Sequence, residues 1–205
     1  MEIKSENIKR YIENNVEIKG NEIELEDIRK LDRININALN FKLEEAIFVP
    51  EELSYLEEIE ECSFANFTIT DEIIENLNKL KKLSIFQFDF CKSTVSKKIY
   101  NNISRIYLNY SDFSLLEMCD NTESMETVFL KNIKDIDVSK INKFRNLKRL
   151  SLLNSEVNNI ESLEKFENLE EVKIIGSKIN NIQVLENLKN RIKIEYSEDE
   201  YFNIG

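Results

Sequence analysis

Histidine and tryptophan are missing from this chain of 205 residues, and only one proline, three glycines and three cysteines occur in it. The absence of histidine removes the commonest general base and the commonest transition-metal ligand. The sequence also has no Gly-rich phosphate loop and no G-x-S-x-G segment. We therefore predict a protein that is not an enzyme, with no catalytic, cofactor-binding or metal-binding residues.

Long apolar runs are absent as well. No stretch approaches the ~18 apolar residues of a membrane-spanning helix, and the first residues lack the basic and apolar segments of a signal peptide. The cysteines Cys62, Cys91 and Cys119 are odd in number and have no metal-ligand spacing. We expect Cys62 to be a small buried hydrophobe. These features predict a cytoplasmic protein without a membrane partner.

What the sequence does contain is a repeat. Apolar residues recur eight times in the pattern L-x-x-L-x-L, with a period of about 22 residues. The units begin at Leu31, Ile59, Leu80, Ile103, Met125, Leu147, Leu169 and Arg191. A fixed period of this length indicates a stack of small units rather than one globular core. Since side chains alternate along a strand, the fourth and sixth positions of each unit face one side, and stacked strands share a continuous core.

Between the strands the apolar spacing lengthens. Ile160, Leu163 and Phe166 have apolar counterparts one period later, at Ile182, Leu185 and Leu188. This spacing predicts short helical or 3₁₀ turns on the outer side. In the earlier units, Pro50 stands at a favourable first helical position and Thr70 is a suitable N-cap. We therefore expect more helix in the early connections.

Two segments carry a family likeness: Asn146-Leu-Lys-Arg-Leu-Ser-Leu-Leu-Asn-Ser-Glu-Val157 and Asn168-Leu-Glu-Glu-Val-Lys-Ile-Ile-Gly-Ser-Lys-Ile179. They resemble the leucine-rich repeat family, in the 22-residue type of bacterial internalins and phosphatase-regulating repeat proteins. The resemblance covers about residues 31 to 197 and is strongest over residues 125 to 190. It implies an α/β solenoid, with a parallel β-sheet on the concave face and short helices, 3₁₀ turns and loops on the convex face.

The chain departs from this family at the ninth position of the unit. Family members usually carry Asn there, and its side chain bonds the backbone of the next turn. This sequence has Leu39, Phe67, Phe88, Ser111, Ile133, Ser155 and Ser177 at that position. We expect the serines to bond backbone amides and the apolar residues to fill space instead.

The scarcity of glycine and proline leaves no linker, so we predict one domain over residues 1–205. A stack exposes core at both ends and needs caps. We assign residues 1–30 to an N-terminal cap, 31–197 to about eight repeats, and 198–205 to a C-terminal cap or tail.

Particular residues are expected to build the caps. In the N-terminal cap, Ser5 is expected to cap a helix, and Val16 to Ile23 to form an irregular leading strand. In the tail, we expect Tyr201 and Phe202 to cover the far end of the stack.

The third, fifth and seventh positions of each unit point to the concave face. Large apolar residues expected there are Phe86, Tyr107, Phe129, Leu153 and Ile175, and Tyr110 lies beside them. Because neighbouring strands are ~4.8 Å apart, these side chains are expected to form one exposed patch. Two other interpretations are open: the side chains stack on one another for stability, or the register is off by one residue and they point inward.

Charge on this face differs from that of the whole chain, which carries −11. The concave positions hold seven basic residues (Arg33, Lys82, Arg105, Lys131, Arg149, Lys173 and Lys193) and three acidic ones (Glu61, Glu171 and Glu195). This contrast predicts a partner with acidic residues near apolar ones, whereas the global charge opposes nucleic acid. The predicted partner-binding residues are Phe86, Arg105, Tyr107, Tyr110, Phe129, Lys131, Arg149, Leu153, Lys173 and Ile175.

The resemblance implies an adaptor, inhibitor or receptor that binds a protein partner by rigid docking on the concave face. The abundance of Asn, Ile, Lys and Glu suggests a bacterial source. We predict a cytoplasmic immunity-type inhibitor of a toxin or enzyme, a step that rests on family analogy. The alternatives are a regulatory or scaffolding subunit of a cytoplasmic enzyme, and an exported internalin-like protein that acts on a host or at the cell surface. We expect the chain to be a monomer or to form a complex with its partner.

Overall fold

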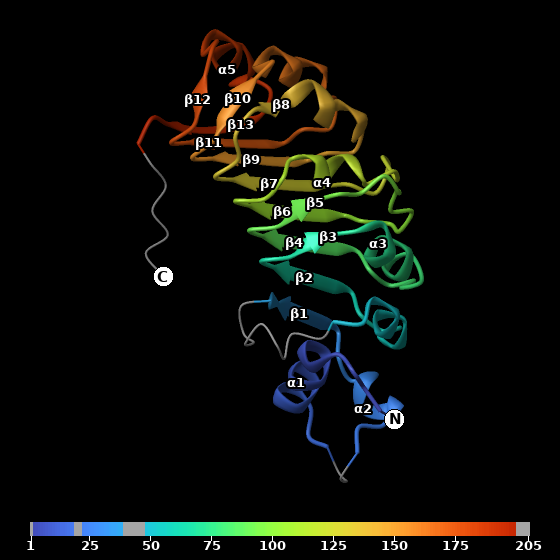
Figure 1. Cartoon of the computed structure of the whole chain (residues 1–205). Coiled ribbons are helices and arrows are strands. Elements are labelled where there is room, and N and C mark those ends of the chain that lie inside the picture. The colour runs from blue at the N-terminus through green and yellow to red at the C-terminus, as the bar shows by residue number, and fades with distance from the viewer. Residues whose placement is uncertain (1, 19–21, 39–47, 200–205) are drawn as a thin grey trace.

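A computed structural model describes residues 2–18, 22–38 and 48–199 of the chain (Figure 1). Eight parallel strands form one sheet, in which each strand lies beside the next along the chain. The strands are β1 (Arg33–Asn37), β2 (Glu61–Ala65), β4 (Ile85–Asp89), β6 (Arg105–Asn109), β7 (Thr127–Lys131), β9 (Arg149–Leu153), β11 (Glu171–Ile175) and β13 (Lys193–Ser197). The predicted parallel solenoid is confirmed.

Short helices and turns return the chain to the start of each strand (Figure 1). They are η2 (Pro50–Tyr55), α3 (Asp71–Leu77), α4 (Ser114–Glu117), η3 (Val138–Lys143), η4 (Ile160–Lys165) and α5 (Gln183–Leu188). As predicted, Pro50 opens η2, and the Thr70 hydroxyl accepts a hydrogen bond from the Ile73 N–H at the start of α3. Two small parallel sheets lie on the outer side, β3 (Thr68–Ile69) with β5 (Lys92–Ser93), and β8 (Ile136–Asp137), β10 (Glu156–Asn158) and β12 (Lys178–Ile179).

The core runs the length of the stack. The fourth and sixth positions of the units are fully buried from Ile34 and Ile36 of β1 to Val172 and Ile174 of β11. Because each strand supplies two inward side chains, every unit completes the apolar surface of its neighbour.

The register of the third unit differs from the prediction. Ile85 pairs with Glu61 of β2, so the unit begins at Leu83 and not at Leu80. Both registers satisfy L-x-x-L-x-L: one uses Leu80, Leu83 and Ile85, and the other uses Leu83, Phe86 and Phe88. In the structure Phe86 and Phe88 point inward, each with an exposed fraction of 0%, whereas the other register would leave Phe86 in water. The predicted placement of Phe86 on the concave face is therefore wrong, since burying two phenylalanines removes more apolar surface from water.

This shift changes the composition of the concave face. Lys82 and Ser84 precede the strand, and β4 presents Ile85, Gln87 and Asp89 instead. The face therefore carries six basic residues (Arg33, Arg105, Lys131, Arg149, Lys173 and Lys193) and four acidic ones (Glu61, Asp89, Glu171 and Glu195). Its net charge is +2, from six minus four, rather than the predicted +4.

Two helices, α1 (Glu6–Asn15) and α2 (Leu25–Ile28), lie at the β1 end of the stack (Figure 1). The Ser5 side chain does not cap α1; its hydroxyl accepts a hydrogen bond from the Val49 N–H at 2.8 Å. The buried carboxylate of Glu52 accepts hydrogen bonds from the N–H groups of Lys4 and Ser5, at 2.6 and 2.8 Å. These bonds attach the N-terminal residues to η2.

The prediction of a leading strand near Val16 is wrong for the described residues, because Val16 is instead the C-cap of α1. Tyr201, Phe202 and Leu39 lie outside the described residues. The division into one domain with two caps stays a prediction. Within the described part of the chain, no helix combines the length and apolar character that crossing a membrane requires.

Candidate binding face

Pairing between β6, β7 and β9 brings most of the predicted residues together. Tyr107 lies opposite Phe129, and Lys131 lies opposite Leu153. The rings of Tyr107 and Phe129 are half-buried, with centroids 5.8 Å apart and planes tilted by 43°. Such a contact contributes about 0.5–1.5 kcal/mol, and the other side of each ring faces solvent.

Leu153 departs from the prediction, because its exposed fraction is only 3%. It stands between Lys131 of β7 and Ile175 of β11 in the same cross-strand row, and these two side chains flank it. Ile175 itself is half-buried. The apolar patch on the sheet is therefore narrower than predicted and centres on Tyr107 and Phe129.

Cations surround this aromatic pair. The outward positions of β6, β7 and β9 include Arg105, Lys131 and Arg149 and no acidic residue. Arg105 and Arg149 are exposed, and the Arg149 guanidinium donates to the Thr127 hydroxyl at 3.1 and 3.2 Å. The three central strands thus form a cationic aromatic surface on a strongly acidic protein.

The strands at the C-terminal end have a different charge arrangement. Lys173 pairs with Glu195 at 2.9 Å, and Lys193 pairs with Glu171 at 2.7 Å. The hydrogen bond from Lys193 lowers the pKa of Glu171. Acids on this part of the face therefore already pair with its lysines, and Glu171 also lies opposite Arg149 of β9.

Each of the six strands between β1 and β13 in the large sheet is followed by a residue in the left-handed backbone region. These residues are Asn66, Phe90, Tyr110, Asn132, Asn154 and Gly176, with φ between 47° and 63°. Each donates its N–H to the carbonyl of the last residue of the next strand, as Phe90 does to Asn109 at 2.9 Å and Tyr110 to Lys131 at 3.1 Å. Asn and Gly tolerate this conformation, so the two aromatic residues are exceptional.

Phe90 and Tyr110, which we call the aromatic edge, stack on one another with centroids 4.8 Å apart and planes within 9°. Both rings remain exposed, by 53% and 56%. A left-handed residue with a Cβ costs roughly 1–2 kcal/mol, and one aromatic stack contributes about 0.5–1.5 kcal/mol. The stack does not offset two strained residues, and strain of this kind concentrates at functional sites.

Sequence reasoning identified Tyr110 but missed Phe90. The cause is the register error in the third unit, which placed Phe88 at the ninth position. In the correct alignment Asp89-Phe90-Cys91 matches Asn109-Tyr110-Ser111, and this correspondence was the available signal.

A row of hydrogen-bonded polar side chains lies at the strand ends, next to the aromatic edge in the sequence. The Asp89 carboxylate accepts hydrogen bonds from Gln87 at 2.8 Å and from Asn109 at 3.0 Å. The side-chain oxygen of Asn109 in turn accepts from the Asn132 amide at 2.9 Å. These bonds fix the seventh and eighth positions of neighbouring units relative to one another.

Serines at the ninth position bond the backbone, as predicted. Ser111 Oγ accepts from the Cys91 N–H and donates to the Phe88 carbonyl, both at 2.9 Å. Ser155 Oγ accepts from the Ile133 N–H at 3.1 Å. The Cys91 thiol takes the same position in its own unit and donates to the Phe64 carbonyl at 3.3 Å. The turns that carry the aromatic edge are therefore rigidly held.

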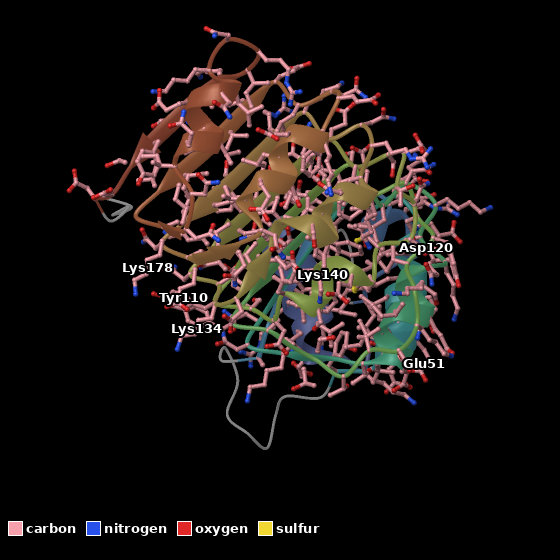
Figure 2. All side chains as sticks on the ribbon, turned by 90° about the horizontal axis from the view of Figure 1, so that it is seen from above. Glu51, Tyr110, Asp120, Lys134, Lys140 and Lys178 are labelled. Carbon is pink, nitrogen blue, oxygen red and sulfur yellow. The ribbon has the colours of Figure 1, made fainter. Side chains whose placement is uncertain are left out.

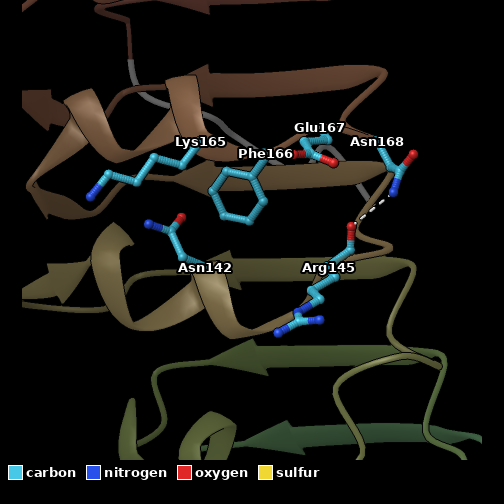
Figure 3. Close-up of a pocket in the computed structure, with 6 residues that line it drawn as sticks. All are labelled: Asn142, Arg145, Lys165, Phe166, Glu167 and Asn168. Atoms are coloured by element: carbon cyan, nitrogen blue, oxygen red, sulfur yellow. Dashed lines mark hydrogen bonds between the residues drawn. The ribbon is translucent and has the colours of Figure 1, made fainter.

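Two hollows lie on the opposite edge, where strands begin. One, of about 350 Å³, is lined by Asn142, Arg145, Lys165, Phe166, Glu167 and Asn168 (Figure 3). In it the Asn168 side-chain amide donates to the Arg145 carbonyl at 3.0 Å. The other, of about 510 Å³, contains the Lys82–Glu58 ion pair. In the second hollow the Ser54 hydroxyl donates to the Glu51 carbonyl at 2.6 Å and not to a side-chain base.

Metal and thiol chemistry find no support in the described residues. No group of three potential metal-ligating side chains occurs among them. Cys62, Cys91 and Cys119 are unpaired and buried. Burial raises the pKa of the Cys91 thiol to about 11 and that of Cys119 to about 12, so these thiols stay protonated at neutral pH and are poor nucleophiles.

No protein-family model and no curated protein sequence matches the chain. Solved structures do match. An internalin, InlF from Listeria monocytogenes, superposes with a TM-score of 0.58 at 18% identity, over 98% of this chain and 64% of that chain. Internalin C2 from the same organism superposes with a TM-score of 0.51 at 16% identity, over 93% of this chain and 91% of that one. This chain thus spans less than two thirds of InlF, and it has the fold of the internalin leucine-rich repeat solenoids.

Proposed function

We propose that this chain is a non-enzymatic module that binds a protein partner on the concave face of β6, β7 and β9. The observation that carries the proposal is the pair of half-exposed rings, Tyr107 and Phe129, among Arg105, Lys131 and Arg149. Aromatic residues and arginine dominate the binding energy of protein interfaces. A partner surface with carboxylates around apolar side chains complements this arrangement.

The rigidity of the scaffold supports docking without rearrangement. The sheet and the ladder of serines and amides hold the face in one geometry, so binding orders few groups. Phe86 and Leu153 drop out of the predicted contact set because they are buried. Lys173 and Ile175 lie at its margin.

Among the roles open to such a module, we propose that of an inhibitor in a bacterial cytoplasm that occludes a toxin or an enzyme. Three buried unpaired thiols suit a reducing compartment. A preformed face suits occlusion, because the inhibitor then need not fold on its target.

Affinity capture from the native cytoplasm tests the binding face. The wild type is compared with a Tyr107→Asp, Phe129→Asp variant, and Tyr100→Asp is the matched control. Tyr100 is 68% exposed and lies in the connection between β5 and β6, away from the sheet face. We expect one partner that the wild type and the control retain and the double variant loses. Identical captures from all three proteins would contradict the proposed face.

The activity of the captured partner then tests the role. If the purified chain suppresses that activity, and the toxicity of the partner in co-expression, the inhibitor proposal is supported. A stable complex with unchanged activity would favour a scaffolding subunit instead. Recovery of the chain from the culture medium would favour an exported protein.

A further inference from the structure

The aromatic edge is an exposed apolar surface distinct from the sheet face. Among the described residues, Phe90 and Tyr110 are the only two of the large exposed apolar side chains whose rings contact one another. The turns after β2, β7, β9 and β11 place Asn or Gly in this left-handed conformation, whereas these two turns place an aromatic residue there. Stacking alone does not account for this choice, so the exposed faces of the rings call for a further explanation.

The edge is continuous with the proposed binding face. Tyr110 follows the last residue of β6, the strand that carries Tyr107, and its N–H donates to the carbonyl of Lys131 on β7. Asp89 and Asn109, which precede Phe90 and Tyr110 in the chain, are held to one another and to Asn132 by side-chain hydrogen bonds. A partner on the sheet face that extends past the strand ends therefore meets these rings.

Charges around the edge favour an acidic partner. Lys92 and Lys134 stand two residues beyond the left-handed position of their turns, are exposed, and form no ion pair within the described part of the chain. Figure 2 shows Tyr110 and Lys134 projecting on the same side of the molecule. Three acids lie nearby. Asp89 accepts hydrogen bonds from its amide neighbours and Asp112 accepts one from the Ser93 N–H at 2.8 Å, while Asp135 is exposed and follows Lys134 in the chain.

We propose that Phe90 and Tyr110 anchor the partner, and that they receive a bulky apolar side chain flanked by carboxylates in an acidic segment of that protein. The carboxylates face Lys92 and Lys134, and the segment continues onto the sheet face toward Arg105 and Arg149. This inference rests on the proposed function and extends the interface around the strand ends. The global charge of −11 disfavours a nucleic acid at the same place.

A variant that keeps the backbone separates binding from folding. Phe90→Asn with Tyr110→Asn installs the residue that three other units use in the same left-handed turn, so we expect a thermal midpoint equal to or above that of wild type. The probe is a random peptide library displayed on phage and selected against the whole wild-type chain. We expect enriched peptides that place Asp or Glu beside an aromatic or aliphatic residue. Synthetic copies should bind the double variant about tenfold or more weakly.

Charge reversal provides a second variant at exposed positions. Lys92→Glu with Lys134→Glu should leave the thermal midpoint unchanged. It should lower the affinity for the same peptides by about tenfold, because the peptide carboxylates lose their cationic partners. The inference is overturned by peptides without acidic residues, by unchanged affinity in either variant, or by a short single-stranded DNA that displaces them from the edge.

The same peptides distinguish this inference from the proposed function. Loss of binding in Tyr107→Asp, Phe129→Asp but not in Phe90→Asn, Tyr110→Asn would retain the sheet face and overturn the edge. The opposite result would retain the edge and overturn the sheet face. Loss in both variants would support one interface that spans the two surfaces.

Discussion

The first three units and the last five are built differently around the same sheet. The early strands begin at uneven intervals, at Arg33, Glu61 and Ile85, whereas the later ones follow at a constant interval, at Arg105, Thr127, Arg149, Glu171 and Lys193. In the early turns the rings of Phe48, Phe64 and Phe67 contact one another edge to face, with centroids 5.4–6.2 Å apart. In the later turns serine hydroxyls bond the backbone.

This difference shows that a solenoid turn is stabilised either by packing or by a polar ladder. The serine bond occurs in units of two lengths, since 20 residues separate Ser111 from Cys91 and 22 separate Ser155 from Ile133. It therefore fixes the turn and not the length of the unit. The candidate interface, on β6, β7 and β9 with the aromatic edge after β4 and β6, lies beside the place where the two halves meet.

The largest effect expected concerns the two faces of one strand in the regular half. Leu130→Asp places a carboxylate in a fully buried position and should unfold the stack, because the charge has no partner there. The neighbouring Phe129→Asp, on the half-exposed side, should cost about 1 kcal/mol through the lost ring contact. Thermal unfolding followed by circular dichroism measures both. Equal damage would show that the assignment of the two faces is wrong.

The second largest effect is expected at the hydrogen bonds between the N-terminal residues and Glu52 of η2. Glu52→Ala removes the carboxylate that two backbone N–H groups share. It should cost about 2–3 kcal/mol, as expected for hydrogen bonds to a buried charged group. Glu51→Ala, at an exposed neighbour, is the control and should change stability little. Amide exchange over residues 4 to 16 should accelerate in Glu52→Ala. Unchanged exchange would mean that other contacts hold α1.

A smaller effect is expected from the polar ladder of the regular half. Ser155→Ala leaves the Ile133 N–H without its acceptor, and an unsatisfied buried N–H costs about 1–3 kcal/mol. Chemical denaturation of this variant measures the contribution of one rung. Ser151→Ala, on the half-exposed sheet face, serves as the control. No difference between the two would show that the ladder is dispensable.

The smallest effect is expected at the boundary between the halves. Cys91→Ser gives the third unit the hydroxyl of the regular turns, with the Phe64 carbonyl available as acceptor. Stability should therefore change by less than about 1 kcal/mol. Cys62→Ser, at a fully buried core position, should cost more because its hydroxyl enters an apolar site. A larger loss at Cys91 than at Cys62 would contradict the assignment of Cys91 to the ladder.

The spacing of apolar residues was enough to predict the architecture and most of the register. The repeat period, with inward positions four and six, is enough to define a parallel stack, because strand side chains alternate and each strand must bury the same face. Tyr107, Phe129, Arg105 and Arg149 were placed correctly on this basis. The role of serine at the ninth position also followed from the chemistry of its hydroxyl.

The register of the third unit, the burial of Leu153 and the aromatic edge depend on contacts between strands. Between Leu80 and Phe88 the local pattern fits two registers, and pairing with β2 and β6 selects the one that buries Phe86. The burial of Leu153 depends on its neighbours from other strands. The aromatic edge arises because the turns after the six strands between β1 and β13 share one hydrogen bond and one left-handed residue, whichever residue type occupies that position. The exposure of a side chain and the strain of its backbone depend on contacts between units, so the sequence of a single repeat does not specify them.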